Sequence, residues 1–329
     1  MRTKLVYLPM SSRRRALAEL SVYEYREADE AEVLECLRMA LGVSETLPHT
    51  PTFWAWKHFE NPFGESLILV ARSGNEVAGL RAYLSWQFLS PNGPLKAYRA
   101  VDTATHPDHQ RKGVFRALTQ EANRRAEASG IDLIFNTPNA KSLPGYLSMG
   151  WSQLGKPRAY VKPLRLAFFG NSHEKGHAAD DPLSFGTDVH YEPEIPGRPP
   201  LGLRTPRSVE YMQWRYQRHP TVAYRMMGNS GGQLIIRANR RAGRSEIVVS
   251  EHLGATGDLF RSLTHRNPAD YLVAVARPGS PDSRTLLRSG FVPAFGRGLT
   301  LVSLPLTGAG KAGSTLGAWD LSAGDLELM

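Results

Sequence analysis

An internal repeat constrains the fold of this chain more than any other feature, because three short segments of its first half recur in the same order in its second half. The corresponding pairs are Trp56 to Pro62 with Trp214 to Pro220, 114–119 with 259–264, and Pro138 to Gly150 with Pro278 to Gly290. Self-similarity of this kind indicates a duplicated structural unit. The repeat therefore predicts two tandem copies of one α/β unit, against the alternative of a chance similarity between two α/β domains.

Segments with strand periodicity alternate with segments of helical periodicity in the first half of the chain. The expected strands are 66–72, 77–87, 97–105 and 131–136, and the expected helices are 113–129, 142–149 and, after a short strand, one within 23–42. A hairpin turn at Gly74-Asn75 joins the first two strands. The turn signal Asn61-Pro62 ends the aromatic segment 53–59.

Changes in composition predict where the units begin and end. We expect a first domain at 1–167 and a second at 205–306. The intervening 168–204 is rich in Pro, Gly, His and Asp and is interpreted as a linker. The final segment, 307–329, is rich in Gly, Ala and Ser and is predicted to be a flexible tail.

The formal net charge of +9 raises the question of a nucleic-acid partner. The basic residues are scattered, however, and no aromatic side chains are interleaved with clusters such as Arg237, Arg240, Arg241 and Arg244. A polyanionic small molecule would explain part of the charge equally well. We therefore expect no nucleic-acid partner.

Residue usage also bears on metals and on the cellular compartment. Cys36 is the single cysteine, so no disulfide framework is possible, and it is expected to be buried. The histidines lack metal-ligand spacings such as H-E-x-x-H. The N-terminus shows no signal peptide, and apolar runs such as 67–71 are too short to span a membrane. We expect a cytoplasmic protein without a metal.

The segment 103–116 carries the strongest chemical signal. In it, the expected strand 97–105 leads through a polar loop into a helix that opens at Gly113. Such a loop presents backbone N–H groups at a helix N-terminus, where the helix dipole also favours an anion. Gly113 allows close approach of the backbone to a phosphate, and Arg111 and Lys112 add positive charge. The segment therefore predicts a phosphate-binding loop.

Two motifs here resemble those of the GNAT superfamily of N-acyltransferases. The segment Gln110-x-x-Gly113-x-Phe115 resembles motif A, Q/R-x-x-G-x-G/A, with phenylalanine at the last position. The second motif is Asn, Tyr and Gly-Phe at fixed spacing, and it is matched by Asn139, Tyr146, Gly150 and Trp151. The resemblance covers about 23–161, and more weakly the second half.

This resemblance implies tandem α/β (α+β) domains, each with a mixed, mostly antiparallel sheet flanked by helices. It also implies that the motif A strand splays from the next strand and that acyl-CoA lies in the gap. The pantetheine arm would then contact the backbone of Thr103, Ala104 and Thr105, and the side chain of Asn139. The diphosphate would lie on Gln110, Arg111, Lys112, Gly113, Val114, Phe115 and Arg116.

The same resemblance implies that Tyr146 protonates the leaving thiolate. Asp102 and His106 are candidates for the base that removes the amine proton, because both lie near the end of the motif A strand. His58 and Glu60 are further candidates by composition alone.

Trp54 and Trp56 allow two interpretations. We favour core packing of an amphipathic helix, and a wall of the acceptor site is the alternative.

The second copy lacks the corresponding chemical groups. Leu286 occupies the position that corresponds to Tyr146, and Gly279 occupies the position that corresponds to Asn139. The basic loop is missing, and the acidic residue Asp258 precedes the helix. The second domain is therefore interpreted as a degenerate GNAT-like domain that shapes or covers the acceptor cleft.

The resemblance thus implies an N-acetyltransferase that moves an acetyl group from acetyl-CoA to a primary amine by direct attack. A small acceptor such as an amino sugar is expected. One alternative is a longer acyl or aminoacyl donor, and another is a CoA-binding module without turnover. The sequence predicts no oligomeric state.

Overall fold

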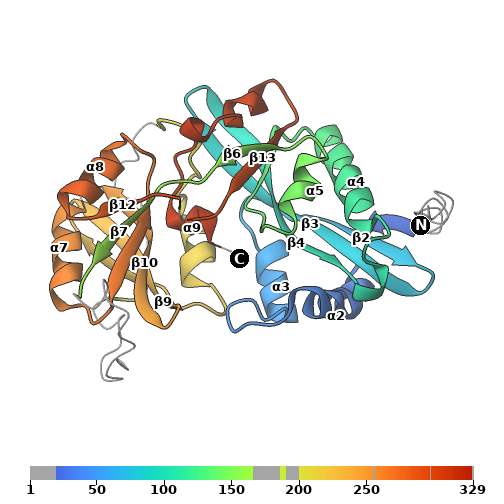
Figure 1. Ribbon diagram of the computed structural model, residues 1–329, viewed down its shortest axis with the longest axis horizontal. Helices are drawn as coiled ribbons and strands as arrows, with labels where there is room; N and C mark the ends of the chain where they lie inside the picture. The colour runs from blue at the N-terminus through green and yellow to red at the C-terminus, as the bar shows by residue number, and fades with distance from the viewer. Residues whose placement is uncertain (1–19, 166–185, 190–199, 255, 297, 328–329) are drawn as a thin grey trace, which may run out of the picture.

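Two β-sheets flanked by helices lie side by side along the longest dimension of the protein (Figure 1). This computed structural model describes residues 20–165, 186–189, 200–254, 256–296 and 298–327. In each sheet one pair of neighbouring strands is parallel and the other pairs are antiparallel. The architecture confirms the predicted pair of α/β units with mixed, mostly antiparallel sheets.

The first sheet has seven strands in the order β1-β2-β3-β4-β5-β13-β6. They are β1 (Leu20–Glu24), β2 (Leu67–Ser73), β3 (Glu76–Ser90), β4 (Gly93–Thr105), β5 (Leu133–Asn136), β6 (Ser152–Gly155) and β13 (Leu301–Pro305). The four predicted strands are present. The hairpin of β3 and β4 is longer than predicted, because pairing continues to its turn at Ser90 and Gly93.

The second sheet has six strands in the order β12-β7-β11-β10-β9-β8. They are β7 (Ala159–Pro163), β8 (Arg225–Asn229), β9 (Gly232–Arg241), β10 (Arg244–Gly254), β11 (Tyr271–Val275) and β12 (Val292–Ala294). Its core is formed with α7 (Gly257–Arg266) and α8 (Pro281–Arg288).

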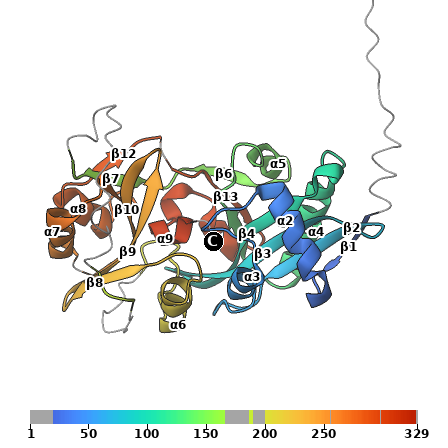
Figure 2. The same cartoon turned by 90° about the horizontal axis from the view of Figure 1, so that it is seen from below.

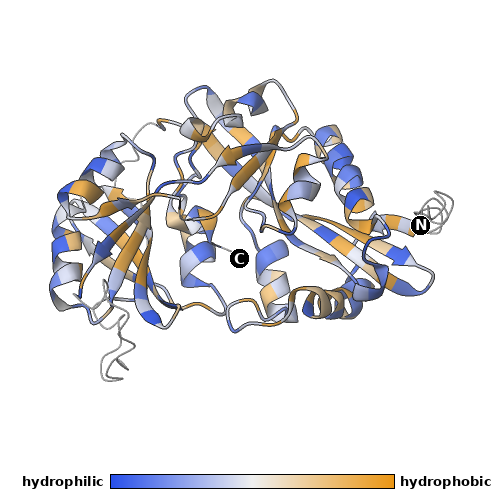
Figure 3. Cartoon of the chain, viewed as in Figure 1, coloured by the Kyte–Doolittle hydropathy of each residue, from blue (hydrophilic) through white to orange (hydrophobic). Residues whose placement is uncertain are grey.

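Helices cover both faces of the first sheet. Helix α2 (Glu30–Leu41) packs with Ile68 and Val70 on one face, and α4 (Val114–Ala128) packs with Leu69 and Ala71 on the other. Successive side chains of a strand point to opposite faces of the sheet. Because helices cover both faces here, nearly every side chain of the strand is buried, and the strand is almost wholly apolar. Figure 3 shows the hydrophobic residues along the strands and the hydrophilic ones on the outer side of α4.

The internal repeat corresponds to repeated structure. β3, β4, β5 and α4 have the same order and pairing as β9, β10, β11 and α7. Gly150 and Gly290 end α5 (Leu143–Leu147) and α8 with similar left-handed φ values of 88° and 84°. The matched segments therefore occupy equivalent places in two copies of one unit.

The repeated tryptophans meet where the two copies join, in the region where Figure 2 shows α3 and α6. Trp56 lies in α3 (Pro51–His58), and Trp214 lies in η4 (Gln213–Gln217), directly after α6 (Val209–Met212). The indole nitrogen of each donates to the main-chain oxygen of the other, at 3.0 and 2.8 Å, and the stacked rings are 5.1 Å apart. Trp54 and Trp56 are both about 2% exposed, which supports their interpretation as core residues.

The two copies exchange one strand each. β7 leaves the first copy and pairs with β11 and β12 in the second sheet, while β13 returns and pairs with β5 and β6 in the first. The predicted boundaries at 167 and 306 therefore do not separate the two sheets. Most of the predicted linker, 168–204, lies outside the described residues.

The segment predicted to be a flexible tail is folded as far as Glu327. It contains η5 (Ala309–Gly313), η6 (Leu316–Ala318) and α9 (Ala323–Leu326), and it buries Trp319 and Leu321. Some of its small residues are required by close packing and do not indicate flexibility. A Cβ at Gly310 would collide with Asp132, and a Cβ at Gly324 would collide with Tyr216.

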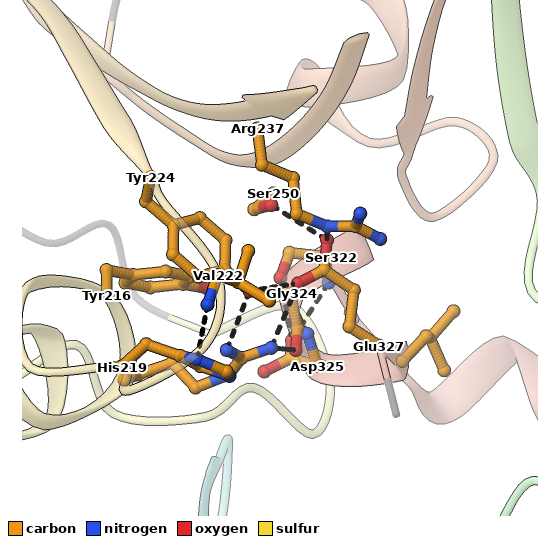
Figure 4. A network of polar contacts seen from close by, with 12 residues as sticks. Tyr216, His219, Val222, Tyr224, Arg237, Ser250, Ser322, Gly324, Asp325 and Glu327 are labelled. Atoms are coloured by element: carbon orange, nitrogen blue, oxygen red, sulfur yellow. Dashed lines mark hydrogen bonds and ion pairs between the residues drawn. The ribbon is translucent and has the colours of Figure 1, made fainter. Parts of the chain in front are cut away.

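Glu327 anchors this tail between the two copies, and Figure 4 shows its side chain among residues of the second copy. Its carboxylate accepts from Arg215, Arg237, Tyr224 and Ser250 at 2.8–2.9 Å. Arg99 of β4 donates to its main-chain oxygen at 2.9 Å. The tail is thus held by both sheets.

Candidate active site

The parallel strands of the first sheet separate at their carboxyl ends. The ladder between β4 and β5 ends at Arg99 and Phe135, whereas β4 continues to Thr105. The edge of β4 that faces β5 is therefore unpaired beyond Arg99, and its backbone groups can bind an extended ligand. Thr103, Ala104 and Thr105 lie on this part of the strand, as predicted from the motif.

A β-bulge shapes the same part of β4. Arg81 pairs with Thr103 and Ala82 pairs with Val101, so Asp102 is the additional residue. Its φ of 36° is unusual for a residue other than glycine and costs backbone energy. The bulge turns the Asp102 side chain toward α3, which is the helix that precedes β2.

Asp102 forms a buried charged cluster with two residues of α3. Its Oδ2 lies 2.6 Å from Lys57 Nζ and 2.9 Å from His58 Nε2, and the other ring nitrogen of His58 lies 2.9 Å from Ser66 Oγ. The side chains of Lys57 and His58 are at most 1% exposed, and that of Asp102 is 10% exposed. Asp102 is thus the member of the cluster nearest to solvent.

The surroundings of Asp102 and His58 set the charge that each carries at neutral pH. Burial alone would raise the pKa of Asp102, but Lys57 and the hydrogen bond from His58 outweigh burial and bring this pKa well below its ordinary value. Burial lowers the pKa of His58, against the opposing effect of Asp102. At neutral pH Asp102 is therefore a carboxylate, and His58 is a neutral imidazole.

The predicted phosphate-binding loop follows β4. It contains η2 (Pro107–His109), and Arg111 and Gly113 have left-handed φ values of 64° and 95° just before α4 begins at Val114. The first backbone hydrogen bond of α4 runs from Ala117 to Gly113. The amides before Ala117 therefore lie at the helix N-terminus, next to the side chains of Arg111 and Lys112.

Tyr146 lies in α5, beside this loop. Its hydroxyl oxygen accepts from Arg81 Nη1 at 2.7 Å, and the same nitrogen donates to the Thr103 hydroxyl. Tyr146 therefore reaches the splayed part of β4. Phe115, which departs from the family motif, packs edge-on against the Tyr146 ring at 5.5 Å and supports it.

Asn139 caps the turn that leads into α5, whose own N-cap residue is Ser142. Its Oδ1 accepts from the backbone of Lys141 and Ser142, at 3.0 and 2.9 Å, and thereby starts the turn into α5. Its side chain is exposed, and its amide nitrogen remains the group that could contact a ligand.

The other candidate bases lie apart from the Asp102 cluster. The His106 ring caps η2, accepts from the Asp108 amide at 3.3 Å and packs against His109. Glu60 is exposed just after α3. Of the four candidates, the structure brings together Asp102 and His58.

Two buried residues near this site were not anticipated. Lys57 gave no distinguishing signal, because its helix also carries polar residues. Arg81 did give one, since it is a single charge within the otherwise apolar run 77–84.

The second sheet carries an equivalent splay, which the chain itself fills. The β10–β11 ladder ends at Val249 and Ala274, with a bulge before Glu251. The tail covers this place: Ser322 donates to Glu251 at 3.0 Å, and α9 packs on β10. Leu286, at the tyrosine position, is a core residue.

The part of the chain that the structure describes contains no group of three or more His, Cys, Asp or Glu residues placed to hold a metal ion. Within the same residues, none of the helices combines the length and the apolar character needed to cross a membrane.

Residues 21–154 match the family model described as an acetyltransferase (GNAT) domain. No curated protein matches the chain.

Several solved structures are similar in fold. A GCN5-related N-acetyltransferase from Anabaena variabilis has a TM-score of 0.61 and 12% identity, over 90% of this chain and 75% of that chain. Its counterpart from Kribbella flavida has a TM-score of 0.54 and 13% identity, over 86% and 70%. Eis1 from Mycobacterium abscessus has a TM-score of 0.54 and 12% identity, over 87% and 73%.

Proposed function

We propose, because residues 21–154 form a GNAT acetyltransferase domain, that the protein transfers an acetyl group from acetyl-CoA to a primary amine. The observation that supports this most is the unpaired edge of β4 beyond Arg99, which leads directly into a basic loop at the N-terminus of α4. One elongated ligand with a peptide-like arm and a diphosphate matches both parts.

The residues present suit the two ends of acetyl-CoA. The backbone of Thr103, Ala104 and Thr105 would pair with the amide groups of the pantetheine arm. The amides that follow Gly113 would hold the diphosphate, assisted by the positive charges of Arg111 and Lys112. The remaining members of the proposed loop are Gln110, Val114, Phe115 and Arg116.

Chemistry would proceed by direct attack. The neutral amine attacks the thioester carbon, and a backbone N–H of β4 stabilises the oxyanion that forms. The C–N bond forms, the C–S bond breaks, and the sulfur leaves with its electron pair. The Tyr146 hydroxyl donates its proton to the sulfur, and the proton lost by the amine restores the hydroxyl through solvent.

Asp102 would act on the acceptor rather than as a strong base. A carboxylate with a depressed pKa accepts protons poorly, but it attracts an ammonium group. It would therefore bring the protonated amine to the thioester, after which water removes the proton. His106, turned toward η2, would contribute to the donor loop instead.

A small acceptor such as an amino sugar is our proposal for the second substrate, with the second copy and the tail limiting the space available to it. A longer acyl or aminoacyl donor would use the same loop. A CoA-binding module without turnover would bind acetyl-CoA and release no thiol with any amine.

Calorimetry with acetyl-CoA tests the donor site. Gly113→Asp and Gly113→Asn have similar shape and both tolerate left-handed backbone, so they differ in charge alone. A carboxylate near the diphosphate should weaken binding by about 10- to 100-fold relative to Gly113→Asn, equivalent to about 1.4–2.8 kcal/mol. Equal affinities of the two variants would place the diphosphate elsewhere.

Thiol release with a panel of primary amines then tests turnover. Tyr146→Phe should lower kcat by about 10²- to 10⁴-fold and leave acetyl-CoA affinity unchanged. Full activity of this variant would remove Tyr146 from the mechanism.

A further inference from the structure

Arg81 is a fully buried cation directly beneath the proposed site. It lies in the middle of β3 and is 0% exposed. Its guanidinium donates to the hydroxyl groups of Tyr146, Thr103 and Tyr83, and it lies 4.8–5.7 Å from the ring centroids of Tyr83, Tyr146 and Phe115.

Every one of these partners is neutral. Among the residues that the structure describes, no carboxylate lies within salt-bridge distance of Arg81, and its Nε has no hydrogen-bond partner. By contrast, the buried Arg207 and Arg215 both pair with carboxylates. Arginine cannot lose its proton in a protein, so this charge stays in place without a carboxylate partner from the described part of the chain.

A buried charge without a counter-charge destabilises a fold. An apolar side chain at the same position would satisfy the packing without that cost. The neighbours of Arg81 in β3, Leu80 and Ala82, show that the strand accepts apolar side chains at this depth. The position of Arg81 is therefore suited to stabilise a negative charge that develops close to it.

The geometry of Arg81 indicates where that anion forms. A single nitrogen, Nη1, contacts both the Tyr146 hydroxyl and the side chain of Thr103 on the splayed part of β4. Because the Tyr146 oxygen accepts from Arg81, its own proton must point elsewhere. A ligand held along β4 beside Thr103 would offer an acceptor for that proton.

We propose that Arg81 is a positioning residue that orients the Tyr146 proton toward the leaving sulfur and supplies the positive charge that stabilises the thiolate. This rests on the proposed function. During C–S cleavage a negative charge develops on sulfur and passes to Tyr146 as its proton is transferred. Arg81 lies next to the oxygen that receives this charge, and it keeps its own protons throughout.

Ionisation of bound CoA tests this without turnover. Thiolate absorbance in the ultraviolet is followed while the CoA complex is titrated through the ordinary thiol pKa of about 8.5, and the same titration with acetyl-CoA subtracts the tyrosine signal. The bound thiol should ionise about one pH unit higher in Arg81→Gln than in wild type. Arg81→Lys, which keeps the charge, should lie between them.

Arg124→Gln is the matched control, because Arg124 is exposed on α4 and pairs with Glu121. It should titrate like wild type. Identical titration of Arg81→Gln and Arg124→Gln would overturn the proposal. If wild type binds neither CoA nor acetyl-CoA, the proposed function itself fails and this inference fails with it, which is a different and recognisable outcome.

A double-mutant cycle gives the second readout. If Arg81 acts through Tyr146, then Arg81→Gln should lower kcat about 10-fold or more in the wild-type background and much less in the Tyr146→Phe background. Equal losses in both backgrounds would show that Arg81 is merely structural. Melting temperature and acetyl-CoA affinity confirm that each variant is folded and loaded.

Discussion

Replacing Asp102 by asparagine should break a buried ion pair. Lys57 Nζ lies 2.6 Å from the Asp102 carboxylate, and its side chain is 1% exposed, so water has little access to the ammonium group. Removal of one member of a buried ion pair typically costs about 3–5 kcal/mol. We expect Asp102→Asn to lower the free energy of unfolding by this amount, as measured by denaturant titration.

A second substitution separates the charge effect from other consequences. In Lys57→Met/Asp102→Asn the ammonium group is removed together with the carboxylate, and an apolar side chain fills its place. Replacing a whole buried pair is often close to neutral, so the double variant should recover stability to within about 1–2 kcal/mol of wild type. It should nevertheless show a raised KM for amine acceptors if Asp102 attracts their ammonium group.

Two outcomes would refute this reasoning. A loss below about 1 kcal/mol in Asp102→Asn would mean that the pair behaves as a solvent-screened surface pair. A double variant as unstable as the single one would mean that the bulge itself, and not the charge, depends on Asp102.

Three further predictions concern the tail, acid stability and the motif asparagine. Glu327→Gln should destabilise the fold by about 2–4 kcal/mol in denaturant titration, because Arg215 and Arg237 lose their carboxylate; an unchanged midpoint would contradict the anchoring role of the tail. Burial, together with the nearby charges of Arg215, Arg237 and Lys57, lowers the pKa of His219 to about 2, so the folded protein binds fewer protons than the unfolded chain. Its contribution to stability is therefore complete above about pH 6.5 and decreases as the pH falls, by about 1.4 kcal/mol per pH unit. Between about pH 6.5 and about pH 5, His219→Asn should lose about 2 kcal/mol less free energy of unfolding than wild type, and equal losses would contradict this assignment. Asn139→Asp keeps the capping oxygen and should preserve the melting temperature while weakening acetyl-CoA binding, whereas Asn139→Ala should cost about 1 kcal/mol of stability; an Asp variant with wild-type affinity would confine Asn139 to its capping role.

Much of the site could be predicted because it is local in the chain. The splayed strand, the loop and the start of α4 follow one another within 97–129, and glycine at 113 is required by its backbone conformation. Tyr146 was identified by its spacing from Asn139 and Gly150. Such patterns survive in sequence because neighbouring residues must satisfy the backbone geometry together.

The supporting residues could not be predicted in the same way. Lys57 reaches Asp102 from α3, and Arg81 reaches Tyr146 from β3, across sequence separations that no short motif spans. The tail was judged flexible from its composition, whereas Gly310 and Gly324 permit contacts too close for a Cβ. A glycine-rich composition is compatible with a flexible segment and with a closely packed one, and only the tertiary contacts distinguish the two.

By itself the sequence determined the duplication, the α/β character of both copies and the strand–loop–helix order of 97–129, because periodicity and turn geometry are properties of consecutive residues. Only the tertiary structure decided that β7 and β13 change sheets, that the tail fills the second splay, and that Arg81 and Lys57 carry buried charges beneath the site. Those features depend on which segments meet in space. A strand has the same apolar pattern whichever sheet it joins. The energetic cost of a charged side chain depends on its burial and on the groups that surround it.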